Sequence, residues 1–166
     1  MKNSVTICNS IDETHLLAEQ IMRQLKGGEI IGLTGELGAG KTEFVRGLAK
    51  TIGAMEDVSS PSFILQNIYR SSSQNKIDTI YHWDLYRVAA SVDLAEILEG
   101  KKKTNSLTLI EWFEKSPFLN KSLDLIIEIK ILEPTKTVVP NPTTVLWHDA
   151  CIRQFTIRQE HRVCRC

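Results

Sequence analysis

Apolar positions near the start of the chain change from the spacing of a strand to that of a helix. Residues 4–8 form a short strand-like run, and Ser10 followed by Glu13 is the pattern of a helix N-terminal cap. One stripe at helical spacing follows, made of Leu17, Ala18, Ile21, Met22 and Leu25. The stripe ends before Gly27 and Gly28, so the pattern predicts a strand and then a helix.

A second strand and a second helix follow directly, joined by a glycine-rich turn. Residues 29–34 (E-I-I-G-L-T) are short and apolar, which is typical of a strand buried on both faces. Beyond the turn, helical spacing is repeated by Phe44, Val45, Leu48, Ala49 and Ile52. Gly53 stands where a helix C-terminal cap is expected.

Strand patterns dominate the next part of the chain. Two strands are predicted at residues 63–70 and 77–83, followed by a short helix at 92–98. Residues 107–110 (L-T-L-I) are apolar throughout, which indicates a central strand, and residues 123–132 alternate like a half-exposed strand. This order predicts a three-layer α/β domain with a mixed, partly antiparallel central sheet.

Composition excludes several classes of protein. The chain has 166 residues, of which 42% are apolar, enough for one domain with a substantial core. Twenty basic and twenty acidic residues argue against a broadly basic nucleic-acid binder. No apolar run reaches the roughly 18 residues that a membrane-spanning helix needs, and the N-terminus lacks a signal-peptide core. Four cysteines without disulfide or zinc spacing fit a reduced, cytoplasmic location with no membrane contact.

Charge divides the chain into two parts. Residues 1–133 hold 15 basic and 18 acidic side chains, whereas residues 134–166 hold 5 and 2, together with three of the five prolines. We therefore predict a working domain at 1–133 and a C-terminal extension of unknown role at 134–166. The extension contains two strand-like runs, at 143–147 and 154–157. Because every motif lies before it, we expect the extension to be dispensable for ligand binding, provided that a chain truncated after Leu132 stays folded.

The glycine-rich turn carries the strongest chemical signal. Residues 35–42 (G-E-L-G-A-G-K-T) match the phosphate-binding P-loop pattern, between a predicted strand and a predicted helix. In such a loop, backbone N–H groups and the helix N-terminus bind phosphate oxygens. Lys41 is expected to neutralise the β- and γ-phosphates and Thr42 to ligate Mg²⁺. The residues expected to contact the nucleotide are Gly38, Ala39, Gly40, Lys41, Thr42 and Glu43. The alternative is a glycine-rich turn beside an exposed lysine.

Two acidic residues follow predicted strands and are candidates for the metal site. Glu111 comes directly after L-T-L-I, and Asp84 comes after I-Y-H-W. Either carboxylate could hold Mg²⁺ or orient an attacking water. The alternative for each is a strand-end carboxylate in solvent or in an ion pair.

Two further features have both a functional and a structural interpretation. His82 could be a general base, but a hydrogen-bonded structural histidine is the favoured interpretation beside Tyr81 and Trp83. Residues 60–62 (S-P-S) could sense the γ-phosphate or form an ordinary proline turn.

Four motifs in this order resemble the TsaE family, also called YjeE: G-E-L-G-A-G-K-T (35–42), S-P-S-F (60–63), H-W-D-L-Y-R (82–87) and I-E-W (110–112). The resemblance implies a P-loop α/β fold, ATP and Mg²⁺ as ligands, and weak ATP hydrolysis that partners stimulate. It also implies action with the proteins TsaD and TsaB, which modify tRNA with threonylcarbamoyladenosine, so that tRNA is met indirectly through the complex.

The family's functional residues match this sequence as follows. Glu111 matches the metal carboxylate, and Asp84 matches the aspartate that activity requires. Thr14 matches a threonine near the nucleobase, and Trp112 matches a tryptophan beside the site. With Lys41, the two carboxylates form the expected catalytic set, and Thr42 with Glu111 forms the expected metal site.

Some positions depart from the family pattern. Ser62 stands where threonine is usual, and Glu43 replaces a serine or threonine, which adds negative charge near the phosphates. The segment 96–106 is shorter than usual. The family often has an arginine after its last strand that can reach the nucleotide, and Lys136 is the only basic residue near that place.

Three functions are compatible with the sequence. The first is a Mg²⁺-dependent ATPase that supports a tRNA-modification complex. The second is a small-molecule kinase, for which the only cationic loop, residues 101–103, lacks the usual arginine. The third is a nucleotide-gated binding module whose hydrolysis is incidental. For the first, we assign Glu111 to Mg²⁺ and Asp84 to positioning water.

Overall fold

The computed structural model describes residues 3–61, 65–71, 75–87, 94–99, 103–132 and 152–160. In chain order its elements are β1 (Ser4–Cys8), α1 (Ile11–Met22), β2 (Ile30–Thr34), α2 (Lys41–Ile52), β3 (Gln66–Arg70), β4 (Thr79–Asp84), α3 (Leu94–Glu99), β5 (Ser106–Glu111), the 3₁₀ turns η2 (Phe113–Lys115) and η3 (Leu119–Lys121), β6 (Leu125–Leu132) and β7 (Ile152–Gln159).

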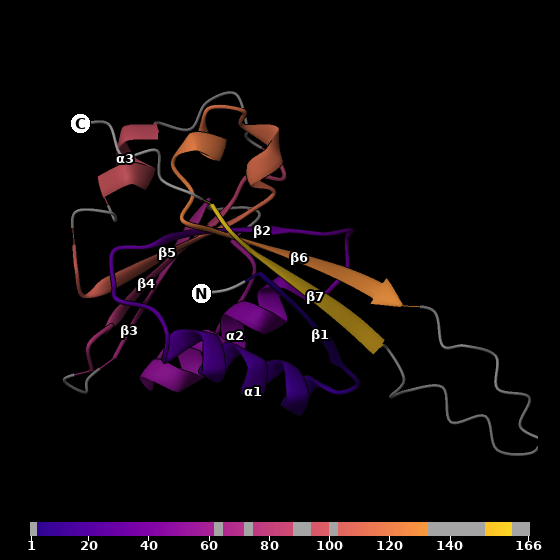
Figure 1. The fold of residues 1–166 in the computed structure, drawn as a ribbon. Helices are drawn as coiled ribbons and strands as arrows, with labels where there is room; N and C mark the ends of the chain where they lie inside the picture. The colour runs from indigo at the N-terminus through magenta and orange to yellow at the C-terminus, as the bar shows by residue number, and fades with distance from the viewer. Residues whose placement is uncertain are drawn as a thin grey trace, which may run out of the picture.

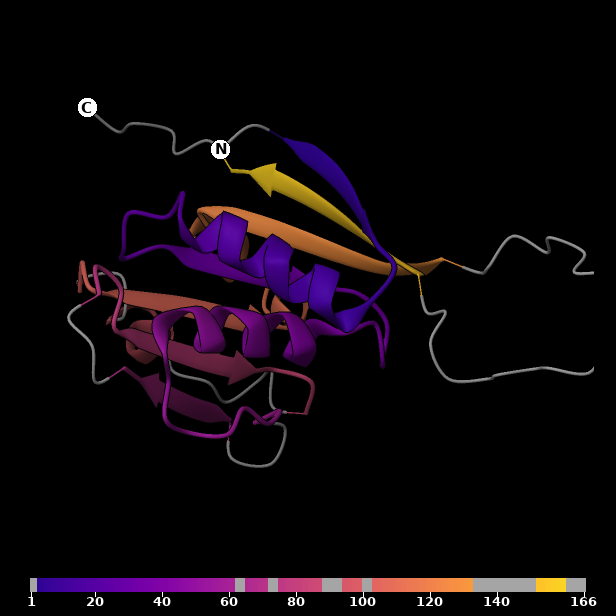
Figure 2. The ribbon, with the colours of Figure 1, turned by 90° about the horizontal axis from the view of Figure 1, so that it is seen from below.

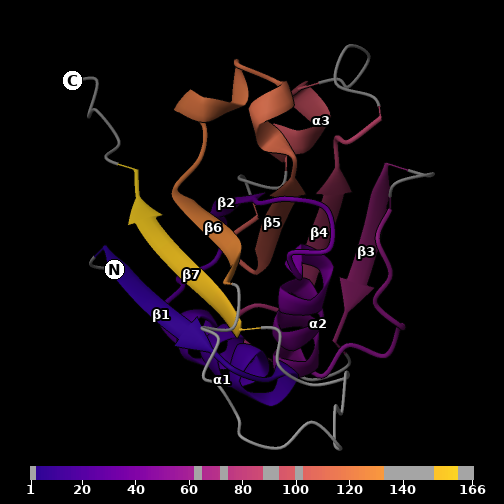
Figure 3. The same ribbon diagram turned by 90° about the vertical axis from the view of Figure 1, so that its right-hand side faces the viewer.

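Seven strands form one sheet in the order β1-β7-β6-β2-β5-β4-β3 (Figure 3). The centre of the sheet is parallel, because β2 pairs in parallel with β5 and β6, and β4 pairs in parallel with β5. The outer pairs β3–β4, β6–β7 and β1–β7 are antiparallel. The predicted mixed sheet is confirmed.

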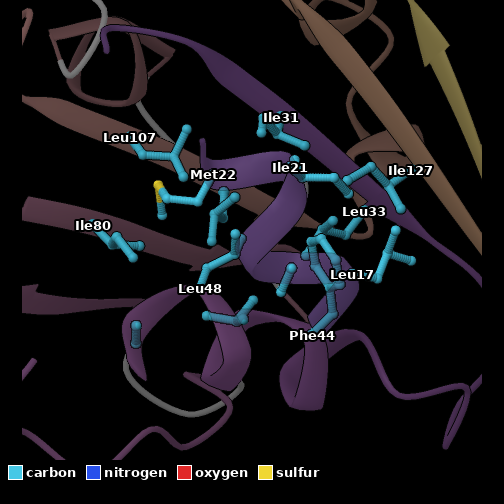
Figure 4. Packing of buried hydrophobic residues seen from close by; sticks show 14 of the residues in the cluster. Leu17, Ile21, Met22, Ile31, Leu33, Phe44, Leu48, Ile80, Leu107 and Ile127 are labelled. Carbon is cyan, nitrogen blue, oxygen red and sulfur yellow. The ribbon is translucent and has the colours of Figure 1, made fainter. Parts of the chain in front are cut away.

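The protein has three layers, with one apolar core on each face of the sheet. Helices α1 and α2 lie side by side against one face of the sheet, and α3, η2 and η3 lie on the other (Figures 1 and 2). Figure 4 shows the larger core, in which Leu17 and Ile21 of α1 and Phe44 and Leu48 of α2 pack onto strand residues such as Leu33. The predicted helical stripes are the buried faces of both helices, except that Leu25 is buried beyond the end of α1.

The start of α1 and the end of α2 follow the predicted signals, whereas α1 ends at Met22 and does not reach Gly27. The Ser10 hydroxyl accepts from the backbone N–H of Glu13 at 3.1 Å, which caps α1. The Glu13 carboxylate accepts from the backbone N–H of Asn9 at 2.7 Å, one residue earlier than in the usual reciprocal pair. Gly53 ends α2 with φ of 72°, a left-handed conformation that favours glycine.

Strand β5 fixes the edge of the sheet where the predicted carboxylates meet. Every residue of β5 from Ser106 to Glu111 is buried. Glu111 and Asp84 are register partners in the parallel β4–β5 pair, so both side chains leave the sheet at the same edge. The two parallel strands therefore place the two acidic residues next to each other.

Strand β7 lies in the predicted extension. It pairs with β6 on one side and β1 on the other, and its Phe155 and Ile157 are buried in the larger core. The run predicted at 154–157 is therefore confirmed as a strand, and the extension supplies a strand to the same sheet. The run at 143–147 falls outside the described residues.

Other predicted elements differ slightly in their bounds. The helix predicted at 92–98 is described as Leu94–Glu99, and the strand predicted at 107–110 extends over Ser106–Glu111. Ser62 and residues 101–102 lie outside the described residues.

Within the described part of the chain, no helix has the length and hydropathy needed to span a membrane.

Candidate nucleotide-binding site

The P-loop joins the end of β2 to the start of α2. Gly38 has φ of 81° and Gly40 has φ of 103°, values that other residues rarely adopt. Among the described residues no side chain caps α2, whose N-cap residue is Gly40, and the first backbone N–H groups of such a helix can bind an anion. A Cβ atom at Gly38 would meet nothing within 4 Å, whereas one at Gly40 would lie 2.8 Å from Arg153 Nε.

A hollow lies over this loop at the carboxyl ends of β4 and β5. It is lined by Leu37, Gly38, Gly40, Lys41, Thr42, Glu43, Ser60, Asp84, Tyr86, Glu111 and Trp112. The structure therefore brings most of the predicted site residues together. Thr14 and Ala39 are not among the lining residues.

Lys41 is folded back onto its own loop. Its Nζ donates to the carbonyl oxygens of Gly35 at 2.8 Å and Glu36 at 3.0 Å, and lies 4.1 Å from the centroid of the Trp112 ring. Burial lowers the pKa of Lys41, and the negative charge of Glu111 opposes that shift. Lys41 is 5% exposed and is one of the residues that line the hollow.

Thr42 and Glu111 are in direct contact. The Thr42 hydroxyl donates to Glu111 Oε1 at 2.9 Å, and the same oxygen lies 2.9 Å from His82 Nε2. Glu111 is 3% exposed and His82 is fully buried. The favoured interpretation of His82 as a hydrogen-bonded histidine is confirmed, and its partner is the predicted metal carboxylate.

Asp84 is held by groups from two loops. Its Oδ2 accepts from the Ser60 hydroxyl at 2.8 Å, and its Oδ1 accepts from the backbone N–H of Tyr86 at 2.9 Å. The residue is 2% exposed although it lines the hollow. The sequence placed Ser60 in a possible phosphate-sensing loop, and the structure joins that loop to Asp84.

Aromatic rings form one wall of the hollow. The rings of Tyr86 and Trp112 have centroids 5.0 Å apart, and Lys115 Nζ lies 4.3 Å from the Tyr86 centroid. Trp112 has φ of 58°, a left-handed conformation that a bulky residue rarely adopts. This turn directs the chain away from β5 immediately after Glu111.

Two predicted contact residues have other partners. Glu43 lines the hollow, but its carboxylate is 2.7 Å from His15 Nε2 and also pairs with Arg46. Thr14 is buried, and its hydroxyl donates to the Ser10 carbonyl at 3.1 Å. Glu43 is therefore bound to His15 of α1 and Arg46 of α2, and Thr14 is bound to Ser10 at the start of α1.

Arg153 contacts the P-loop, and the sequence did not indicate this contact. Its Nε donates to the carbonyl oxygen of Ala39 at 2.9 Å, so the second residue of β7 supports the P-loop. The strand pattern at 154–157 was visible in the sequence, but its neighbours in the sheet were not. Lys136, the basic residue noted near the expected place, lies outside the described residues.

The oxygen ligands around the hollow suit magnesium. Mg²⁺ is usually held by one or two carboxylates together with phosphate oxygens and waters. The Thr42 hydroxyl and the carboxylates of Glu111 and Asp84 are such ligands. Among the described residues there is no group of three or more His, Cys, Asp or Glu side chains placed to hold a metal by themselves.

Comparison with known proteins places the chain in a family. The sequence pattern of the family described as "Threonylcarbamoyl adenosine biosynthesis protein TsaE" matches residues 8–138. The chain belongs to the TsaE family. It is 40% identical over 136 residues to the tRNA threonylcarbamoyladenosine biosynthesis protein TsaE of Aquifex aeolicus, an alignment that covers 80% of this chain and 91% of that protein. Against the TsaE of Rickettsia bellii it is 36% identical, over 82% of this chain and 92% of that protein.

A solved structure shares the TsaE fold seen here. The crystal structure of Bacillus subtilis YdiB superposes with a TM-score of 0.65 at 24% identity, covering 94% of this chain and 84% of that chain. The predicted P-loop α/β fold is therefore confirmed. Strand β7 begins at Ile152, beyond the residues that the family pattern matches.

Proposed function

We propose that this protein is a Mg²⁺-dependent ATPase that supports the modification of tRNA with threonylcarbamoyladenosine. The observation that carries the proposal is the contact between Thr42 at the start of α2 and Glu111 at the end of β5, beside an uncapped helix N-terminus. This pairing of a P-loop hydroxyl with a strand-end carboxylate is the arrangement that P-loop hydrolases use for the metal. Relatives named as tRNA threonylcarbamoyladenosine biosynthesis proteins support the biological role.

Binding of the triphosphate requires Lys41 to change partners. Its ammonium donates to two carbonyl oxygens of the loop, which are weaker acceptors than phosphate oxygens. We expect the β- and γ-phosphates to replace these carbonyls, while backbone N–H groups of the loop donate to the same phosphates. The Trp112 ring then limits where the lysine can move, because it lies against the ammonium.

Thr42 and Glu111 are the residues that we assign to the metal. Mg²⁺ held there supplies positive charge to the phosphates in the transition state. The Thr42 hydroxyl donates its hydrogen to Glu111, which leaves the lone pairs of its oxygen available to a cation. The carboxylate is buried and fixed, which reduces the reorganisation that binding requires.

Asp84 is assigned to the attacking water. Its position beside Glu111 in the sheet register puts a second carboxylate at the edge of the hollow. The backbone N–H of Tyr86 and the Ser60 hydroxyl fix both of its oxygens. A carboxylate held in this way can accept a hydrogen bond from water and orient it toward the γ-phosphate.

The proposed partners are TsaD and TsaB, with tRNA met through their complex. With twenty basic and twenty acidic residues, the chain offers no overall charge to attract tRNA. We therefore assign most tRNA contacts to the partners.

ATP hydrolysis measured with and without TsaD–TsaB tests the proposal. We expect slow release of phosphate by the chain alone and faster release with the partners. Lys41→Ala should abolish Mg·ATP binding in calorimetry, whereas Lys50→Ala, an exposed lysine in the last turn of α2, should bind like wild type. Equal rates with and without partners contradict the role in the complex. ADP release without free phosphate, on addition of small-molecule acceptors, would identify a kinase instead.

A further inference from the structure

A buried chain of hydrogen bonds runs from Glu111 through His82 and Tyr69 to the loop that contains Ser59. Glu111 Oε1 lies 2.9 Å from His82 Nε2, and His82 Nδ1 lies 3.2 Å from the Tyr69 hydroxyl. The Tyr69 hydroxyl lies 3.0 Å from the carbonyl oxygen of Ser59. His82 is fully buried and Tyr69 is 1% exposed, so solvent does not compete for these contacts.

The sheet register explains why the three side chains meet. Tyr69 of β3 is paired with Ile80 of β4, and His82 is two residues further along β4 on the same face. His82 in turn is paired with Leu109 of β5, and Glu111 is two residues further along that strand. Each step crosses one strand and advances two residues, so the chain crosses three strands on the face that α2 covers.

The contact with His82 fixes how the carboxylate is presented. Oε1 receives both the Thr42 hydroxyl and the imidazole, whereas Oε2 has no hydrogen bond from any described residue. Glu111 also belongs to the lining of the hollow. The imidazole thus holds one oxygen and leaves the other available to a cation, as partners of metal-binding carboxylates commonly do.

The far end of the chain reaches the loop that holds Asp84. Ser59 precedes Ser60, whose hydroxyl donates to Asp84 Oδ2. The Ser59 carbonyl also accepts from the Asn67 side chain at 2.9 Å. A phenol has one hydrogen, so Tyr69 donates either to the Ser59 carbonyl or to His82 at any one time. When the phenol donates to Nδ1, the ring has its hydrogen on Nε2, where it can donate to Glu111.

We propose that Tyr69 and His82 are positioning residues that orient Glu111 for magnesium and couple it to the loop at residues 58–60. This inference rests on the proposed function, because it takes Glu111 as the metal carboxylate. Neither residue lines the hollow, so both act through Glu111 and through Ser59. The consequence is that one network links both carboxylates of the site.

Tyr69→Phe tests the proposal because it removes the hydroxyl and keeps the ring. Tyr81→Phe is the matched control, since Tyr81 lies on β4 and its hydroxyl contacts Lys103 outside the chain of hydrogen bonds. The affinity for a fluorescent ATP analogue is measured with excess EDTA and across a Mg²⁺ titration. For Tyr69→Phe we expect unchanged affinity without metal and a Mg²⁺ midpoint raised about tenfold, the size usual for loss of a residue that orients a ligand. The control should match wild type in both.

A second measurement uses the protein without nucleotide. Glu111→Gln should shift the backbone amide NMR signals of Ser59 and Ser60 in the wild-type background, and this shift should disappear in the Tyr69→Phe background. Loss of the shift supports coupling through Tyr69, and an equal shift in both backgrounds overturns it.

His82→Gln and His82→Leu make the first test independent of Tyr69. Glutamine keeps an N–H donor, so His82→Gln should raise the Mg²⁺ midpoint less than His82→Leu does. Leucine has no donor, so His82→Leu should raise the midpoint at least as much as Tyr69→Phe. Melting temperatures identify any variant that does not fold, and the remaining variants then decide. A Tyr69→Phe protein that folds and has a wild-type Mg²⁺ midpoint overturns the proposal, as does an equal loss of affinity with and without Mg²⁺. If wild type shows no Mg²⁺-dependent binding of the ATP analogue, the assignment of Glu111 to the metal is wrong. The amide measurement still tests whether Glu111 is coupled to Ser59 and Ser60 through Tyr69.

Discussion

The two sides of the P-loop are built in different ways. On one side, the parallel strands β4 and β5 end in register at Asp84 and Glu111, so their carboxylates meet where the strands stop. On the other side, the antiparallel strand β7 passes the loop and supplies Arg153 from its second position. The first side carries groups suited to chemistry, and the second supports the loop through the Ala39 carbonyl.

Burial differs between the two sides as well. All six residues of β5 are buried, whereas in β7 only Phe155 and Ile157 are. The carboxylate side therefore gains its rigidity from burial on both faces of a central strand. The β7 side depends on one well-packed face and on pairing with β1 and β6. This difference leads us to expect that damage on the β7 side acts first on folding, and damage on the β5 side acts first on the metal.

Truncation after Leu132 should have the largest effect, because it removes β7. Strand β1 then loses its only partner in the described sheet, and the core loses Phe155 and Ile157. Loss of one buried Phe side chain alone costs about 3 to 5 kcal/mol. The position of β7 thus gives a reason to expect that the extension stabilises the fold. The expectation from the sequence concerned ATP binding by a truncated chain that stays folded, and it stays a prediction. Urea unfolding followed by circular dichroism measures the effect.

A substitution within β7 separates packing from chain length. Phe155→Ala should lower the free energy of unfolding by about 3 kcal/mol, whereas Thr156→Ala, on the opposite face of the strand, should change it little. A truncated chain that unfolds at the wild-type urea concentration would show that β7 adds nothing to stability.

Replacement of either carboxylate by its amide should have the next largest effect. These substitutions act at the ends of β4 and β5, on the carboxylate side of the P-loop. Glu111→Gln removes a charge that contacts both Thr42 and His82, so the Mg²⁺ titration of ATP hydrolysis should shift at least tenfold. Asp84→Asn keeps the shape of a side chain held by Ser60 and Tyr86, and should reduce turnover about a hundredfold with little change in ATP affinity.

Turnover and binding must be measured on both variants to separate the roles. A shift of the Mg²⁺ titration by Asp84→Asn, without one by Glu111→Gln, would reverse our assignment. Removal of Mg²⁺ with EDTA should stop hydrolysis by wild type and by Asp84→Asn alike.

The sequence predicted the carboxylate side well because its signals are local. An apolar run followed directly by Glu111 indicates a buried strand and the group at its end, and the P-loop pattern lies within eight residues. The sheet order could not be predicted in the same way, because pairing of β7 with β1 joins Thr6 to Phe155 across most of the chain. Arg153 was missed for this reason.

Contacts between side chains of different helices and strands could not be predicted from local sequence patterns either. Glu43 follows Thr42 and lines the hollow, but the sequence did not show that its carboxylate pairs with His15 of α1, 28 residues earlier. The strand-like period around His82 did not indicate that Tyr69 and Glu111 are its neighbours. Both sets of contacts depend on how helices and strands pack, which the spacing of residues along one element does not contain.

Replacement of Arg153 should have the smallest effect, and it tests whether the β7 side supports the loop directly. Arg153→Met keeps an apolar stem but removes the Nε–H that donates to the Ala39 carbonyl. The backbone groups of the loop remain, so we expect Mg·ATP affinity in calorimetry to fall only about fivefold, which corresponds to about 1 kcal/mol for one hydrogen bond. Arg158→Met is the matched control, because Arg158 lies on the same strand, is largely exposed and pairs with Glu128 at the surface. Equal losses in both variants would mean that the general positive charge of β7 matters and that the contact with Ala39 does not. A loss confined to Arg153→Met, with an unchanged melting temperature, would show that the antiparallel side of the sheet shapes the phosphate loop as well as stabilising the fold.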